Sequence, residues 1–239
     1  MNSLHNFLFG YFPYICLTVF LLGSLLRYDR DQYTWKTDSS QMLRTGQLRW
    51  GSNLFHIGIL VIFFGHAVGL LMPSFIYETF MSAADKKLMA ISVGGLAGVM
   101  GLIGLSLLLQ RRLGDARIRA ASKPGDIILL WLLWAQFALG LATIPFSIQY
   151  HLDGSKMVQL SSWAQHIVTL RAGAPELLVG VDWLTKAHLL LGMSLFLIFP
   201  FTRLVHVWSG FGTLAYLSRP YQLVRSRRLG LPDRGNAPR

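Results

Sequence analysis

Residues 53–72 read NLFHIGILVIFFGHAVGLLM, a stretch without a single lysine, arginine, aspartate or glutamate. An apolar run of about 18 or more residues, rising about 1.5 Å per residue as a helix, is long enough to cross the hydrocarbon core of a bilayer. The stretch also contains His56 and His66, although ionisable side chains are costly at membrane depth and are usually functional there. It therefore predicts both a membrane-spanning helix and a functional site within that helix.

Four further segments are similarly apolar, and they cover residues 7–26, 88–109, 127–148 and 183–208. The backbone polar groups of a membrane span must be hydrogen-bonded within the protein, so each segment is expected to be a helix. Charged residues make up only 14% of the chain, against about 25% in soluble domains. The predicted fold is all-α, an integral membrane bundle of five transmembrane helices that occupies residues 1–228.

Lysine and arginine are distributed unevenly between the two sides of this bundle. The segments 27–49, 111–123 and 203–239 share one side and hold 17 of these residues, whereas the other side holds five. Cytoplasmic segments carry such an excess, which places the N-terminus outside and the C-terminus in the cytoplasm, with residues 229–239 as a disordered cytoplasmic tail. The asymmetry also accounts for the net charge of +11 without a nucleic-acid partner. In the longest outer loop, residues 156–169 are expected to form a short amphipathic helix.

Four of the seven histidines lie in two apolar segments, His56 and His66 in the second and His188 and His206 in the fifth. Neutral imidazole is a common axial ligand of haem iron, and ligation by two histidines takes one from each of two facing helices. The second and fifth helices run in opposite directions. Equal depth therefore pairs His56 with His206 on the inner side and His66 with His188 farther out.

The spacing of these histidines supports the pairing only in part. His188 and His206 are 18 residues apart, which is five turns of an unbroken helix and about 27 Å of rise. His56 and His66 are ten apart, which gives about 15 Å of rise and about 80° of rotation. Tilted helices, or ligands at unequal depths, would have to absorb this difference.

Each of these features also has a purely structural alternative. A single histidine can be a hydrogen-bonded packing residue, and Arg203 either contacts a haem propionate or anchors the inner face. Glycines near the histidines either make room for a flat macrocycle or serve helix packing, which is also the main interpretation of the G-x-x-x-G pair Gly94 and Gly98. The glycines near the histidines are Gly58, Gly65, Gly69 and Gly192. The spans contain almost no acidic residues, which argues against a proton-coupled transporter.

Five stretches carry a resemblance to a known family, together with the four histidines His56, His66, His188 and His206. They are LLRYD (25–29), QYTW (32–35), SNLFHIGIL (52–60), TIPFS (143–147) and YQLVR (221–225). In this order and spacing the chain resembles the gamma subunit of respiratory nitrate reductase, the cytochrome b membrane anchor of that enzyme, up to about Arg228.

The resemblance implies two haem b groups as cofactors. It makes His66 and His188 the axial ligands of the iron of the outer haem, and His56 and His206 those of the inner haem. Electrons would pass from the outer to the inner haem and then to the cytoplasmic partners. These partners are the iron–sulfur beta subunit and the molybdopterin alpha subunit, in a bacterial inner membrane that carries out nitrate respiration.

The resemblance also implies quinol as the substrate, oxidised near the outer face. Residues expected at this site are Gly65, His66 and a lysine after the second helix, for which Lys86 is preferred over Lys87. The alternative role for Lys86 is an interface anchor whose charged end reaches the membrane surface. Two broader alternatives stay open: the cytochrome b anchor of a hydrogenase or formate dehydrogenase, and a haem-free transporter or structural anchor.

Overall fold

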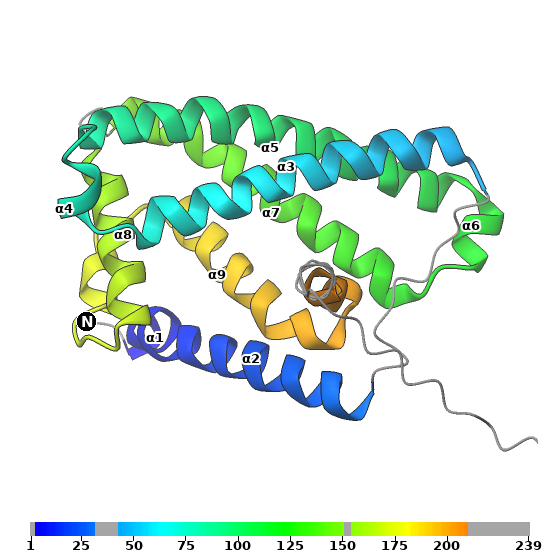
Figure 1. The fold of residues 1–239 in the computed structure, drawn as a ribbon, viewed down its shortest axis with the longest axis horizontal. Coiled ribbons are helices and arrows are strands. Elements are labelled where there is room, and N and C mark those ends of the chain that lie inside the picture. Colours follow the sequence, from blue (N-terminus) through cyan, green and yellow to red (C-terminus); the bar gives the residue numbers. More distant parts are fainter. Residues whose placement is uncertain (1–2, 32–42, 151–153, 210–239) are drawn as a thin grey trace, which may run out of the picture. The chain divides into compact units, whose positions relative to one another are not determined.

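A computed structural model describes residues 3–31, 43–150 and 154–209, and every regular element among these residues is a helix. The chain divides into two compact units, Met1–Val205 and His206–Arg239. The first unit contains five helical segments long and apolar enough to cross a membrane (Figure 1). The prediction of an all-α bundle with five spans is confirmed.

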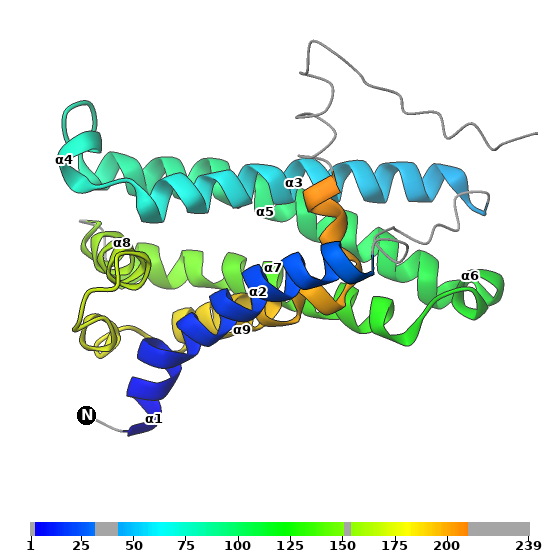
Figure 2. The same cartoon turned by 60° about the horizontal axis from the view of Figure 1, so that its bottom comes forward.

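Consecutive spans of the first unit run in opposite directions (Figures 1 and 2). The spans are α1 (Ser3–Asn6), η1 (Phe7–Tyr11) and α2 (Phe12–Arg30) together, then α3 (Thr45–Leu71), α5 (Ala83–Gly114), α7 (Pro124–Tyr150) and α9 (Trp183–Ile198). The shorter elements are α4 (Ser74–Tyr77), α6 (Ala116–Ala120), α8 (Ser155–Val168), η3 (Pro175–Leu178), η4 (Phe199–Phe201) and η5 (Arg203–Val205). The two histidines of the opening stretch both lie on α3.

Glycines bring α3 and α5 into direct backbone contact. A Cβ atom added to Gly58 would lie 2.9 Å from the Cα of Gly101, and one added to Gly104 would lie 2.4 Å from the backbone nitrogen of Phe55. Small residues allow membrane helices to approach in this way. The packing interpretation therefore holds for Gly58. The close contacts of α5 with α3 lie at Gly101 and Gly104, whereas a Cβ added to Gly94 would meet nothing within 4 Å.

The fifth span is interrupted, although an unbroken helix over residues 183–208 was expected. The α-helix ends at Ile198 and gives way to the 3₁₀ turns η4 and η5. Pro200 has no backbone N–H, and in a helix its ring collides with the carbonyl four residues earlier. Since the helix breaks here, the expectation of five unbroken helical turns from His188 to His206 was wrong.

The first span supplies hydrogen-bond donors to this interruption. The guanidinium group of Arg27 donates to the carbonyl oxygens of Pro200, at 2.6 Å, and of Thr202, at 2.9 Å. A broken helix leaves carbonyl groups without partners within the helix. Arg27 therefore stabilises the break from the neighbouring helix α2.

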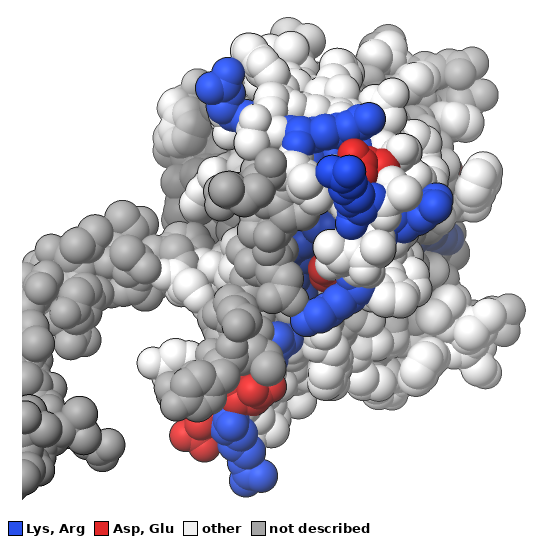
Figure 3. Space-filling view, turned by 90° about the vertical axis from the view of Figure 1, so that its right-hand side faces the viewer, with Lys and Arg blue, Asp and Glu red and all other residues white. Residues whose placement is uncertain are grey.

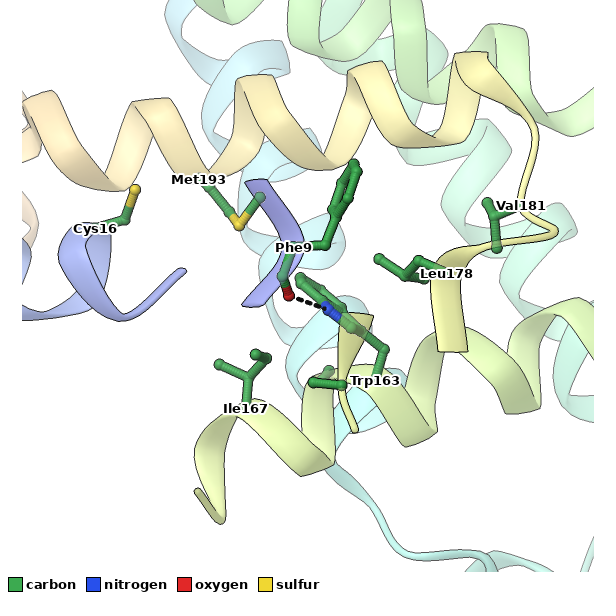
Figure 4. Close-up of a cluster of buried hydrophobic side chains, with 9 residues drawn as sticks. Phe9, Cys16, Trp163, Ile167, Leu178, Val181 and Met193 are labelled. Carbon is green, nitrogen blue, oxygen red and sulfur yellow. Dashed lines mark hydrogen bonds between the residues drawn. The ribbon is translucent and has the colours of Figure 1, made fainter. Parts of the chain in front are cut away.

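The amphipathic helix α8 lies across the end of the bundle where α3 ends (Figure 1), close to its predicted range. Its apolar face joins a buried cluster, in which Trp163 Nε1 donates to the carbonyl oxygen of Phe9 at 3.0 Å (Figure 4). Ser161 donates to the carbonyl of Gly69 at 2.9 Å, and Gln165 to those of Leu70 and Met72, both at 3.2 Å. The helix α8 thus caps the last turn of α3.

Basic side chains gather at the opposite end of the first unit, where α6 lies (Figure 3). Some are paired with acidic groups: Arg44 lies 3.2 Å from Asp115, and Arg112 and Arg203 each lie 3.6 Å from a carboxylate oxygen of Asp126. The two ends of the bundle therefore differ in chemistry, one closed by α8 and the other charged.

Candidate functional site

The structure brings together two of the four histidines that the sequence singles out. The imidazole rings of His66, on α3, and His188, on α9, face each other with centroids 6.2 Å apart and planes inclined at 46°. More than a hundred residues separate the two in the chain. They are the two histidines that matching by depth pairs on the outer side.

Both histidines on α3 have one ring nitrogen held by their own helix. Nδ1 of His66 lies 2.8 Å from the carbonyl oxygen of Ile62, and Nδ1 of His56 lies 2.7 Å from that of Ser52. A carbonyl oxygen only accepts hydrogen bonds, so in each neutral ring Nδ1 carries the proton. Nε2 is then left unprotonated, which is the form in which imidazole binds a metal ion.

The surroundings of His188 differ, because its ring lies against the bare backbone of α7. A Cβ atom added to Gly140 would lie only 2.9 Å from Cε1 of this ring. On the same helix, Gln136 Nε2 donates to the backbone carbonyl of His188 at 3.2 Å. The glycine therefore makes the room that the imidazole occupies, and the glutamine contacts the same turn of α9.

The facing pair fits the axial ligands of a haem iron. An imidazole centroid lies about 1.1 Å from each ring atom, so two rings bound to one metal ion at about 2.0–2.1 Å would have centroids roughly 6.3 Å apart, close to the 6.2 Å observed. Among the described residues, no group of three or more histidine, cysteine, aspartate or glutamate side chains could hold a bare metal ion. Two opposed imidazoles suit a metal whose other ligands come from a planar macrocycle.

Two lysines near the start of α5, Lys86 and Lys87, are both buried, with 5% and 6% of their surface exposed. Lys87 Nζ donates to the carbonyl oxygen of Ser147 at 2.8 Å, which ties α5 to α7. Lys86 Nζ lies 3.9 Å from the ring centroid of Tyr77 in a cation–π contact. Burial, and to a lesser degree the carboxylate of Glu78, raises the pKa of the Tyr77 phenol, so this ring stays neutral beneath the ammonium group.

Gly65, the other residue predicted at the quinol site, lies next to His66 on an exposed part of α3, and a Cβ added there would meet nothing within 4 Å. His56 is exposed on the same helix. His206 belongs to the second unit, whose described residues 206–209 are helical. The ligand pair His56 and His206 stays a prediction.

Arg203, the predicted propionate contact, lies in η5. It and Arg112 flank the single carboxylate of Asp126, each at 3.6 Å. Arginine binds carboxylates well through its forked donors. The chemistry suits a propionate, and the role of Arg203 stays a prediction.

Three residues of the site region were not singled out from the sequence: Tyr77, Gln136 and Gly140. Gln136 offered a signal, because it is an amide within an otherwise apolar span, and Gly140 follows it by one helical turn. Tyr77 had no comparable signal, since aromatic residues are common at membrane interfaces.

Comparisons with known proteins agree over almost the whole chain. The model of the nitrate reductase gamma subunit family matches residues 5–227. The respiratory nitrate reductase 2 gamma chain of Escherichia coli (strain K12) is 56% identical over 229 residues, 95% of this chain and 100% of that one. The respiratory nitrate reductase 1 gamma chain of the same strain is 52% identical over 227 residues, with the same coverage. The nitrate reductase gamma chain of Bacillus subtilis (strain 168) is 38% identical over 221 residues, 92% of this chain and 97% of that one.

Proposed function

The chain belongs to the nitrate reductase gamma subunit family and is a membrane subunit of respiratory nitrate reductase; from this we propose that it oxidises quinol and passes the electrons inward through two haem b groups. The anchor of a hydrogenase or formate dehydrogenase is set aside by the family membership. The observation that carries the proposal is the opposed pair His66 and His188, 6.2 Å apart between ring centroids.

In the outer half of this proposal, His66 and His188 hold a haem b between α3 and α9. The bound group would supply a one-electron carrier at membrane depth. The contribution of the protein is to hold the ligands: the carbonyl of Ile62 fixes the tautomer of His66, and the bare backbone at Gly140 leaves room for the ring of His188.

Quinol oxidation is proposed near Lys86, Gly65 and His66. Losing a proton leaves negative charge on a quinol oxygen, and a buried ammonium group stabilises such a charge more strongly than one in water. Lys86 is suited to this role because Tyr77 holds it below the surface through its aromatic face, whereas Lys87 is engaged with Ser147. This burial also distinguishes it from a lysine that reaches out to the headgroups. The protons leave on the outer side.

On the inner side, His56 and His206 are proposed as ligands of the second haem, with Arg203 as a contact for its propionate. The basic end of the bundle at α6 (Figure 3) then faces the cytoplasm, as the excess of lysine and arginine indicates. It receives the iron–sulfur beta subunit, which connects to the molybdopterin alpha subunit. The N-terminus lies outside, and membrane lipid covers the exposed apolar side chains of the spans.

A haem count on the purified complex tests this function. The expected result is two haem b per gamma chain, measured by reduced-minus-oxidised spectra and pyridine haemochrome. The variants His66→Ala and His188→Ala should each retain one haem. His166→Ala is the matched control, because His166 lies on α8 with Nδ1 2.7 Å from its own helix carbonyl at Ser162, and it should retain two. A folded protein without haem, or an outer-site variant with two bis-histidine haems, would overturn the proposal.

A further inference from the structure

The helices α7 and α9 interlock through two matching pairs of residues, each spaced by four. A Cβ atom added to Gly140 would lie 2.9 Å from Cε1 of His188, and one added to Gly192 would lie 3.0 Å from Nε2 of Gln136. Residues four apart share a helix face. On each helix a large polar side chain is therefore followed, one turn later, by the glycine that receives the partner's side chain.

Two buried polar atoms at this contact have no hydrogen-bond partner among the described residues: Oε1 of Gln136 and Nδ1 of His188. Buried polar groups are nearly always paired, and an exception calls for an explanation. The two atoms are complementary. Gln136 Nε2 donates to a carbonyl oxygen, which makes Oε1 the accepting end of the amide, and a neutral imidazole donates through one of its nitrogens.

The two histidines on α3 show what His188 lacks. Each places Nδ1 within 2.8 Å of the carbonyl four residues earlier, whereas Nδ1 of His188 has no such bond. The Cε1 edge of the ring faces α7, with Nδ1 3.5 Å and Nε2 3.6 Å from the Cβ position at Gly140, and of the two nitrogens it is Nδ1 that is buried without a partner. Gln136 lies one turn before Gly140 on α7, and its unpaired Oε1 is an acceptor that this helix offers to Nδ1.

We propose that Gln136 is the positioning residue of His188: its Oε1 accepts the Nδ1–H of His188 and directs the opposite nitrogen, Nε2, to the iron of the outer haem. The inference rests on the proposed function, since it concerns a haem ligand. Accepting this hydrogen bond raises the basicity of the imidazole ligand, which favours the oxidised iron. Gln136 thereby keeps the midpoint potential of the outer haem low relative to an otherwise identical site without the amide.

Redox titration of the two haems in the purified complex tests this role. Gln136→Met keeps the length of the side chain and removes the acceptor. Loss of one neutral hydrogen bond corresponds to about a tenfold change in an equilibrium constant, which is about 59 mV for a one-electron couple. The outer haem is expected to shift upward by about this amount while the inner haem stays unchanged.

A second variant separates positioning from mere packing. Gln136→Glu supplies a stronger acceptor and should shift the outer haem downward, opposite to Gln136→Met, whereas a packing defect would shift both variants the same way. If Gln136→Met loses the outer haem, the sign of the shift in Gln136→Glu decides. Trp134→Phe is the control, because it removes a hydrogen bond of α7 to Ser106 of α5, 3.0 Å long, and should leave the outer potential unchanged.

The outcomes distinguish this inference from the function beneath it. If both haems are present and each has the same potential in wild type, Gln136→Met and Gln136→Glu, the role of Gln136 is overturned and the proposed function is not. A shift in the same direction for both variants would do so too. Absence of haem from the wild-type complex would instead overturn the proposed function.

Discussion

Replacing Gly104 with alanine is expected to destabilise the chain at the contact between α5 and α3. The added Cβ would lie 2.4 Å from the backbone nitrogen of Phe55 and 2.7 Å from the carbonyl oxygen of Gly51. Both atoms belong to the backbone of α3 and cannot rotate away. Raising the shorter distance to 3.0 Å, below which Cβ contacts essentially never occur, requires the two helices to separate locally by at least 0.6 Å.

Gly94→Ala on the same helix provides the matched comparison, because a Cβ added there meets nothing within 4 Å. Both variants gain about 1 kcal/mol of helix propensity, so this gain cancels between them. Overpacking costs about 1–3 kcal/mol, and that difference should appear between the two variants. For a chain of this size each kcal/mol corresponds to about 2–4 °C, which gives a difference of about 2–12 °C in Tm.

The assay is thermal unfolding of the purified complex in detergent, followed by helical circular dichroism at one detergent concentration. Gly104→Ala is expected to unfold below Gly94→Ala by that interval. If the two variants unfold at the same temperature, α3 and α5 do not meet at Gly104 through backbone contact, and the argument for glycine packing fails.

Three further predictions concern the ends of the spans. Arg27→Leu leaves the carbonyls of the break at η4 without a donor and should cost about 1–3 kcal/mol; an unchanged Tm would contradict this. Although burial raises the pKa of Asp182, hydrogen bonds from Lys156 and the first turn of α9 lower it overall. The stabilisation from this carboxylate is therefore complete above its unfolded pKa of about 3.9 and is lost as pH falls through the lower folded pKa. Asp182→Asn should therefore lose less Tm on acidification than the wild type. Parallel plots of Tm against pH for the two proteins would refute this. Gln165→Leu should speed amide exchange in the last turn of α3, measured by mass spectrometry, and exchange at the wild-type rate would exclude a capping role for Gln165.

The five spans could be predicted from the sequence because the length of an apolar block alone decides whether it crosses a bilayer. Depth along two antiparallel helices similarly sufficed to pair His66 with His188. The interruption at Pro200 was missed, because the surrounding residues are apolar on both sides and apolar composition does not report helix continuity. Its partner Arg27 lies about 170 residues away in the chain, and no local pattern connects the two.

The helix contacts were predicted in kind and only partly in position: a Cβ added to Gly98 would lie 2.8 Å from Leu141 of α7, whereas one added to Gly94 would meet nothing within 4 Å. The spacing of Gly94 and Gly98 indicates that this helix can approach another closely, yet spacing does not say at which depth two helices come together. That depends on how α3 and α5 cross, and they meet at Gly101 and Gly104. The pairing of Gln136 with His188 was missed for the same reason, since it depends on which faces of α7 and α9 meet.

The two sides of α3 explain how one helix can be fixed firmly and still present both histidines. At about 100° per residue, His56 lies about 160° around the helix from Gly58, and His66 about 80°. The side that carries Gly51 and Gly58 is locked to α5 by backbone contact, which leaves the remaining surface for cofactors. Gly104 contacts α3 at Gly51 and Phe55, which precede His56 by five residues and by one residue, at most about one and a half turns. If His56 and His66 ligate the two proposed haems, a displacement there should alter the spectrum and potential of the inner haem more than those of the outer haem, because His66 lies about three turns farther along, where α8 holds the end of α3.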